Sequence, residues 1–306
     1  MAEIHSPSPL VLFIRISRPL FLLGAALVYA LGVGVADYLG VNINWNIYLL
    51  GQAWVTSLQL GGIYLYEYYN ALSEAGRPHH NSASDPNSKL GLGRPPVTML
   101  FAAAASLTAV ASLSVLMIRS LHPSPETILM MGLAAFGVVV YSVPPVRLAF
   151  SGYGELIVAI LIANLVPAFA FLLQVGELHR LLAMSTFPLT FLLLAFFLVS
   201  ELDDYATDVR RDRRTLMVRV GWQRGMYLHN GLILGAYLLV GLALTFGMPM
   251  FIGLPAFLPL PLGVLQIWQM RRIADGSKPN WRSLRLSAAV LFGITAYLLM
   301  FAYWTR

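Results

Sequence analysis

The chain contains no cysteine, which excludes disulfide bonds and thiolate chemistry. Charge is also scarce, because Asp, Glu, Lys and Arg make up 11% of the 306 residues, against roughly 25% in an ordinary soluble domain. A soluble protein of this size could not cover its surface with so few charged side chains. Hydrophobic residues account for 58% of the sequence. The composition therefore predicts an integral, multi-pass membrane protein.

The net charge of +6 does not by itself point to a partner. Lys and Arg collect in the cytoplasmic loops of membrane proteins whatever their function. We therefore expect membrane lipids around the chain and no nucleic acid among its partners. The net positive charge also suits an anionic substrate. Arg15 and Arg18 interrupt the first apolar stretch, which favours a retained first span over a cleaved signal peptide.

Apolar stretches divide the chain into about nine spans, each near the roughly 20 residues that cross a bilayer. The sixth is short and is expected to continue as a helix into the acidic residues after it. The eighth contains Pro255, Pro259 and Pro261, and is expected to be kinked or broken. The predicted spans are Val11–Ala36, Ile47–Tyr69, Val97–Ile118, Thr127–Val143, Leu156–Leu173, Phe187–Val199, Met226–Phe246, Phe251–Gln269 and Leu284–Trp304.

The distribution of basic residues predicts the orientation. With nine spans and the N-terminus inside, 17 of the 20 Lys and Arg residues lie on the cytoplasmic side, as the positive-inside rule requires. The two long loops, Ala71–Pro96 and Asp203–Gly225, also lie on that side. We expect a protein of the cell membrane, with its N-terminus and active site at the cytoplasmic face.

Acidic residues gather in two of these cytoplasmic regions. Glu67, Asn70 and Glu74 have the spacing i, i+3, i+7 after the second span, and Glu201, Asp204 and Asp208 repeat that spacing after the sixth. On a helix each set forms one oxygen-rich stripe. The four-span separation favours one domain over residues 1–306, with halves of roughly 11–150 and 151–306. Each half would have four helices, with a ninth helix completing the bundle around a central cavity.

Two explanations fit the acidic stripes. Carboxylates at membrane depth need partners, and two facing stripes would repel each other unless cations lay between them. Mg²⁺ takes a few carboxylates together with substrate phosphates. The alternative is that the acids pair with the abundant arginines as a solvated rim. The matching spacing and position of the two stripes favour the metal.

Basic residues accompany the acids. Arg18 lies near the start of the first span, Tyr141 and Arg147 lie at the end of the fourth, and Arg213 and Arg214 follow the second stripe. Arginine binds phosphate oxygens bidentately, so these residues favour a diphosphate on an apolar tail. Positive-inside bias remains the simpler explanation for some of the basic residues.

These motifs resemble the UbiA-type intramembrane prenyltransferase superfamily. Its second motif, Asp-x-x-x-Asp, is present as Asp204 and Asp208, and Arg18-Pro19 matches the Arg-Pro of its first helix. The stretches 141–155 and 212–221 resemble the menaquinone-biosynthesis branch, with Asp212 in place of a glycine.

The first motif departs from the family pattern. Glu67, Asn70 and Glu74 stand where three aspartates are expected, and Arg77 is the nearest substitute for a following Arg-Thr pair. The resemblance therefore implies an altered first motif that still carries oxygen ligands.

The resemblance implies transfer of a polyprenyl group from an allylic polyprenyl diphosphate to a lipophilic or aromatic acceptor, with a quinone precursor favoured. It implies Mg²⁺ as cofactor, catalytic roles for Glu67, Asp204 and Asp208, and a diphosphate held by basic and phenolic side chains. Alternatives are a terpene cyclase that uses the same site, a non-catalytic relative, and a transporter of an anionic solute. The implied metal ligands are Glu67, Asn70, Glu74, Asp204 and Asp208. The implied diphosphate-binding residues are Arg147, Arg213, Arg214, Arg18, Tyr141 and Arg77.

Overall fold

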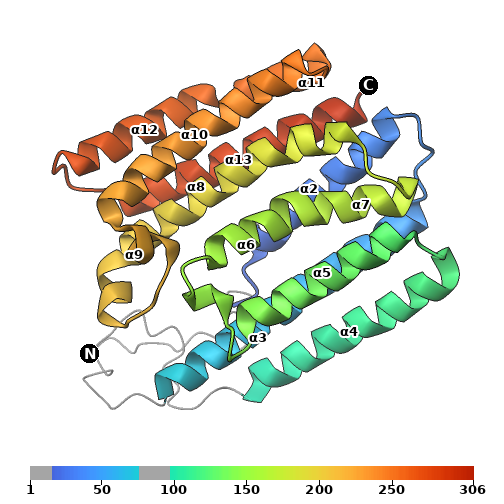
Figure 1. Cartoon of the computed structure of the whole chain (residues 1–306), viewed down its shortest axis with the longest axis horizontal. Coiled ribbons are helices and arrows are strands. Elements are labelled where there is room, and N and C mark those ends of the chain that lie inside the picture. The colour runs from blue at the N-terminus through green and yellow to red at the C-terminus, as the bar shows by residue number, and fades with distance from the viewer. Residues whose placement is uncertain (1–15, 76–96) are drawn as a thin grey trace, which may run out of the picture.

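The computed structural model describes residues 16–75 and 97–306, and these residues form helices joined by short loops (Figure 1). The long helices are α2 (Pro19–Tyr38), α3 (Trp45–Ala75), α4 (Val97–Leu121), α5 (Pro125–Ser142), α8 (Arg180–Arg210), α10 (Trp222–Thr245), α12 (Leu260–Ala274) and α13 (Trp281–Trp304). The shorter segments are η2 (Leu148–Phe150), α6 (Gly154–Ile160), η3 (Leu161–Leu165), α7 (Val166–Val175), α9 (Leu216–Val220), α11 (Met250–Gly253) and η4 (Leu254–Phe257).

The helices confirm the predicted all-helical membrane architecture. In the described part of the chain, eight helical segments are long and apolar enough to cross a membrane. Helix α3 is not among them because glutamines and acidic residues lower its hydropathy. Its 31 residues nevertheless extend about 46 Å. With α3 counted, the arrangement matches the expected number of about nine spans.

Two predictions about individual spans are confirmed. Helix α8 continues from Arg180 to Arg210, so the sixth span does run on into the acidic residues. The eighth span is broken into α11, η4 and α12, because proline cannot donate a helical hydrogen bond and its ring displaces the preceding turn.

The predicted first span is broken at Arg18. Helix α2 begins at Pro19, and Arg18 precedes it in a left-handed conformation with φ of 49°. Ile16, before it, is helical, so Arg18 interrupts the predicted span at the N-terminal end of α2. The predicted residues 11–15 of that span lie outside the described residues.

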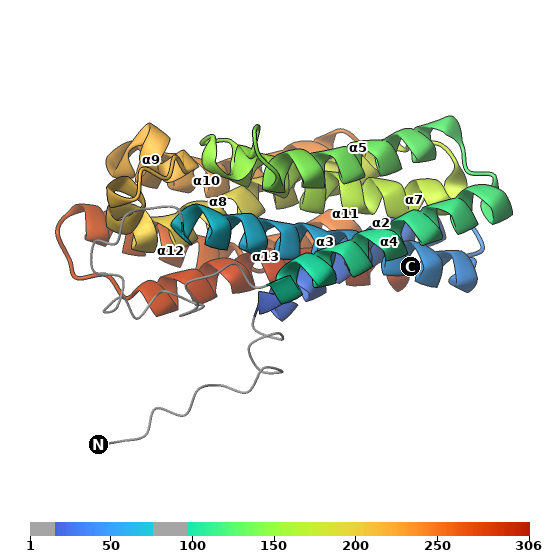
Figure 2. The same cartoon turned by 90° about the horizontal axis from the view of Figure 1, so that it is seen from below.

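The helices lie side by side as nearly parallel rods. Helix α4 packs along α3, α10 along α8, and α13 against both α2 and α8. Seen from below, α5 and α7 lie in one layer and α3, α4 and α13 in another (Figure 2). A Cβ added at Gly32 of α2 would collide with the backbone carbonyl of Pro167 on α7. Glycine is needed there because the two backbones approach so closely.

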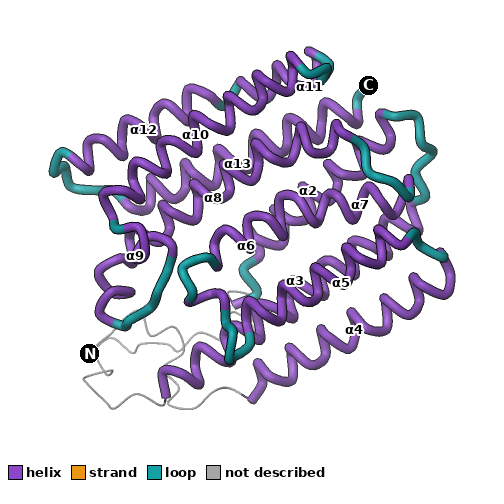
Figure 3. The backbone as a smooth tube through the Cα atoms, viewed as in Figure 1, coloured by secondary structure: helices purple, strands orange, loops and turns teal. Residues whose placement is uncertain are grey.

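Loops gather at the two ends of the rods (Figure 3). Because successive helices reverse direction, the C-terminal ends of α3, α5 and α8 lie at the same end as the N-terminal ends of α2 and α6. This end carries both predicted acidic stripes and the basic residues that accompany them.

Candidate active site

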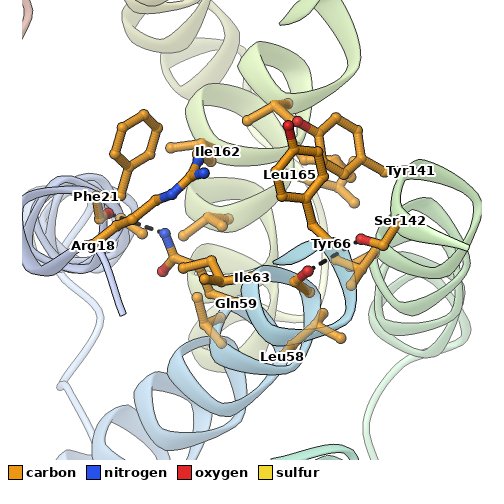
Figure 4. A pocket seen from close by; sticks show the side chains of 18 of the residues that line it. Arg18, Phe21, Leu58, Gln59, Ile63, Tyr66, Tyr141, Ser142, Ile162 and Leu165 are labelled. Atoms are coloured by element: carbon orange, nitrogen blue, oxygen red, sulfur yellow. Dashed lines mark hydrogen bonds between the residues drawn. The ribbon is translucent and has the colours of Figure 1, made fainter. Parts of the chain in front are cut away.

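A cavity of about 160 Å³ opens between α2, α3, α5, α6, η3, α7 and α8. Apolar side chains form most of its wall, while Arg18, Tyr66 and Tyr141 lie together at one end (Figure 4). Tyr66 and Tyr141 stack with ring centroids 5.9 Å apart. The cavity thus joins a cationic and phenolic mouth to an apolar interior.

Arg18 is held at this mouth by an ion pair. Its guanidinium donates to Glu67 at 2.7 Å, and its Cζ lies 5.5 Å from the centroid of the Tyr66 ring. Burial acts to lower the pKa of Arg18, but Glu67 together with Tyr66 and Tyr141 outweighs this effect, and the net pKa is raised. Arg18 therefore remains a cation at the entrance. Its left-handed backbone, which a residue with a Cβ rarely adopts, is typical of strained positions at functional sites.

The first predicted stripe faces basic residues. Glu67 accepts from Arg18, and the Asn70 Oδ1 accepts a 3.0 Å hydrogen bond from Arg213. Glu74 lies in the last turn of α3, and Arg77 lies outside the described residues. The bond from Arg213 links α3 to the segment that follows α8.

The second stripe lies in the C-terminal turns of α8. Asp208 is 7% exposed, and its backbone carbonyl accepts from the Arg213 N–H at 2.9 Å. Asp204, one turn earlier, is exposed. Asp203 forms an ion pair of 3.1 Å with Arg285 of α13. Arg213 thus follows the end of one stripe in the chain and binds a member of the other.

Glu201 has a different role from the one predicted by its place in the stripe. Its Oε2 accepts the Met217 N–H at 3.1 Å, while Glu155 accepts the Leu216 N–H at 3.2 Å. Both carboxyl groups therefore satisfy backbone donors at the start of α9. This contact ties α6, α8 and α9 together beneath the basic segment.

Two loops meet at the mouth and bring the basic residues together. Phe150 lies under Arg147 and Arg213, with guanidinium-to-centroid distances of 4.1 and 5.5 Å. Ser151 forms a parallel bridge with Arg214, and the Ser151 carbonyl accepts from Arg219 at 3.1 Å. Arg147 also has a left-handed backbone, with φ of 37°. The stretches that carry Arg147 and Arg213 are therefore docked on each other.

The structure brings most of the predicted residues to one place. Arg18, Tyr66, Glu67 and Tyr141 surround the mouth, and Arg213 reaches Asn70 across the site. Arg214 is exposed beside this group. Within the described residues, no three His, Cys, Asp or Glu side chains are grouped closely enough to hold a metal ion by themselves. The metal ligands and diphosphate-binding roles therefore remain predictions.

Sequence analysis did not identify the residues that shape the cavity. Trp54, Gln59 and Phe169 line it but carry no motif, and their positions depend on how distant helices pack. Gln59 lines the cavity and donates to the Phe21 carbonyl at 3.0 Å. A signal in the sequence that points to the cavity is the cluster of tyrosines around Glu67, at positions 64, 66, 68 and 69, of which Tyr66 lines the cavity.

The fold and the site define an intramembrane protein with a charged mouth on an apolar pocket. The family model described as "UbiA prenyltransferase family" matches residues 91–289. The chain belongs to the UbiA prenyltransferase family. The matched range contains Asp204, Asp208 and the two docked loops, and it begins after the altered first motif. No curated protein sequence matches the chain at a significant level.

Solved structures confirm the fold. A UbiA homologue from Archaeoglobus fulgidus bound to GPP and Mg²⁺ is 17% identical, with a TM-score of 0.62 over 94% of this chain and 99% of that one. The same homologue bound to DMAPP and Mg²⁺ is 18% identical, with a TM-score of 0.61 over 94% and 98%. A structure of digeranylgeranylglyceryl phosphate synthase is 13% identical, with a TM-score of 0.65 over 97% of both chains.

Proposed function

We propose that this chain transfers a polyprenyl group from an allylic polyprenyl diphosphate to an aromatic quinone precursor within the membrane, with Mg²⁺ as cofactor. The observation that carries the proposal is the cavity itself. A mouth with Arg18, Tyr66 and Tyr141 suits a diphosphate, and the apolar wall behind it suits a prenyl tail. Family membership supports the same class of reaction.

The diphosphate would bind among the basic residues of the mouth. Arg18 and Arg213 already hold oxygen acceptors at 2.7 and 3.0 Å. A diphosphate can take the place of these acceptors, because one guanidinium group donates two parallel hydrogen bonds to its anionic oxygens. Arg147 and Tyr141 would complete the set, with Arg214 at the exposed edge and Arg77 as the remaining predicted contributor.

The oxygen donors fit a shared magnesium site better than a closed protein cage. Mg²⁺ usually takes one or two carboxylates together with waters and substrate phosphates, which suits Asp204 and Asp208 on α8. Glu67, Asn70 and Glu74 on α3 are the proposed ligands on the facing side. When bound, the ion would neutralise charge on the departing diphosphate. The Mg²⁺ in the structures of the archaeal homologue supports this assignment.

The chain's own residues would do the remaining work. The allylic C–O bond breaks with its electron pair going to the diphosphate, a C–C bond forms to the acceptor ring, and the ring proton is lost. Arginines preorganised at the mouth stabilise the charge that develops on the leaving group. The stacked rings of Tyr66 and Tyr141 offer π-faces to the allylic cation, while the apolar wall excludes water that would quench it.

The menaquinone-like stretches at 141–155 and 212–221 support an aromatic acceptor. The two stretches are docked on each other through Ser151, Arg214 and Arg219. Dihydroxynaphthoate is the acceptor that we propose to test first. The basic-residue distribution supports a location in the cell membrane, with the site facing the cytoplasm.

The test is an incubation of purified protein with geranylgeranyl diphosphate and Mg²⁺, with and without dihydroxynaphthoate, followed by mass analysis. We expect an acceptor-dependent prenylated product. Acceptor-free hydrocarbon would replace the proposal with a terpene cyclase. Intact substrate that binds without turnover would indicate a non-catalytic relative.

A matched pair of variants controls for folding. Asp208→Asn removes a proposed ligand, whereas Asp275→Asn changes an exposed aspartate at the end of α12. We expect the first variant to lose turnover and the second to retain it, with both proteins eluting as folded species. Equal activity in the two variants would refute the role of Asp208.

A further inference from the structure

The apolar cavity ends at a pair of aromatic side chains. Trp54 on α3 and Phe169 on α7 both line it, with ring centroids 4.9 Å apart. Each residue is only 2% exposed. Tyr66 lines the mouth a little over three turns of α3 beyond Trp54, and Val158 precedes Phe169 by a similar stretch. Both walls therefore place this pair at the end remote from the diphosphate.

Helix geometry sets the depth of the cavity. Twelve residues separate Trp54 from Tyr66 on α3, which corresponds to about 18 Å along the helix axis. A tail whose diphosphate lies at Arg18 and Tyr66 would therefore have this length available before meeting the aromatic pair.

Hydrogen bonds and close packing fix the position of the Trp54 side chain at the closed end of the cavity. The Trp54 Nε1–H donates to the Ser114 Oγ at 2.8 Å, and that hydroxyl donates to the Val110 carbonyl at 2.7 Å. Behind the pair, buried side chains fill the space, among them Tyr29, Val33 and Met131. Protein interiors are close-packed, so a prenyl tail could pass this point only by displacing the core.

We propose that Trp54 and Phe169 set the length of the prenyl donor, a statement that rests on the proposed function. With carbon–carbon bonds of about 1.5 Å in a zigzag chain, each four-carbon repeat advances roughly 5 Å, so the distance to the aromatic pair corresponds to about three to four isoprene units. The donors of this length are farnesyl and geranylgeranyl diphosphate. A much longer tail would extend into the packed core behind the aromatic pair.

The experiment compares geranyl, farnesyl, geranylgeranyl and octaprenyl diphosphates as donors for the full-length protein. We expect kcat/KM to rise up to farnesyl or geranylgeranyl diphosphate and to fall for octaprenyl diphosphate. Trp54→Leu opens the closed end. It should raise the octaprenyl-to-geranylgeranyl ratio of kcat/KM by about tenfold or more, since misfit of one methylene in an apolar pocket is worth about tenfold.

A second variant acts in the opposite direction. Ala134→Phe adds bulk to the cavity wall on α5, and it should shift the preference toward geranyl diphosphate. Trp268→Leu is the matched control, because this tryptophan on α12 is 52% exposed and lies outside the cavity. Wild-type protein that uses octaprenyl and geranylgeranyl diphosphates equally would overturn the proposal. So would an unchanged ratio in the two cavity variants.

Binding measurements test the limit on tail length independently of the proposed reaction. The rise in Tm of the detergent-solubilised protein with each diphosphate reports tail fit without turnover. The rise in Tm should be largest with farnesyl or geranylgeranyl diphosphate, and the maximum should shift to a longer donor in Trp54→Leu. This result would support a length limit set by Trp54 and Phe169 even if no donor were consumed. A rise in Tm that does not depend on tail length would refute this length limit without contradicting the proposed prenyl transfer.

Discussion

Arg213 offers the sharpest test of how the mouth works. It donates to Asn70 on α3 at 3.0 Å, its guanidinium lies over Phe150, and its backbone N–H is held by the Asp208 carbonyl. The side chain therefore connects the first predicted stripe to the loop after α5, while the backbone of the same residue binds the end of the second stripe. Arg213→Ala removes this connection and one cation at the proposed diphosphate site.

The expected effect on catalysis is much larger than the effect on stability. Loss of one preorganised donor at a developing anion typically costs about 2.7–4 kcal/mol, or about 10²–10³ in kcat. Arg213 is half-buried, so its bond to Asn70 is partly screened by solvent and contributes about 1 kcal/mol to folding. We therefore expect Arg213→Ala to fold and to be nearly inactive.

The assay follows diphosphate release and donor affinity in detergent or vesicles. Arg213→Lys keeps the charge but not the planar fork, so it should recover part of the affinity and little of kcat. Arg224→Ala is the matched control, because Arg224 is an exposed arginine in the first turn of α10. A rate for Arg213→Ala within about threefold of the control, far from the expected 10²–10³, would refute the proposed role.

Three further predictions follow from the same residues. Asp204→Ala should abolish turnover without loss of folding, because Asp204 is exposed; wild-type rates would exclude it as a ligand, and Asp275→Ala is the control. Asn70→Asp should tighten the Mg²⁺ dependence by adding a hard anionic ligand; an unchanged Mg²⁺ titration would mean that Asn70 is not a ligand. Asp212 has φ of 50°, so Asp212→Gly should be neutral or stabilising, whereas Asp212→Ala should cost about 1 kcal/mol. Thermal unfolding in detergent measures that order, and the reverse order would contradict the backbone argument.

Asp212 also explains one departure from the family pattern. In the stretch 212–221, the resemblance to the menaquinone branch predicts a glycine at this position. The structure needs a positive φ there, which glycine adopts freely and aspartate tolerates better than most residues. The substitution therefore retains the turn that presents Arg213 and Arg214, and it is not evidence of a different local fold.

Hydrophobic runs predicted the helices because crossing a bilayer demands about 20 apolar residues and internally satisfied backbone groups. The same physics predicted that α8 continues through its acidic end and that the eighth span breaks at its prolines. Arg18 in the first apolar stretch likewise indicated an interruption, and the backbone turns at Arg18, just before α2 begins.

The candidate site was also predictable only in part. Local spacing was sufficient to group Glu67 with Asn70 and Asp204 with Asp208, since residues three or four apart share a helix face. Their partners were not predictable, because the contacts from Arg18 to Glu67 and from Arg213 to Asn70 join residues far apart in the chain. Periodicity says which side chains share a face; it carries no information about which distant face will oppose them.

The sequence alone determined that this chain is a helical membrane protein and which residue types gather at the ends of α3 and α8, because hydropathy and helical spacing are local properties. Only the tertiary structure decided the shape of the cavity and its closure by Trp54 and Phe169, since these depend on how α3 and α7 pack. Such packing is set by the summed fit of many side chains from separate helices, which no single stretch of sequence encodes.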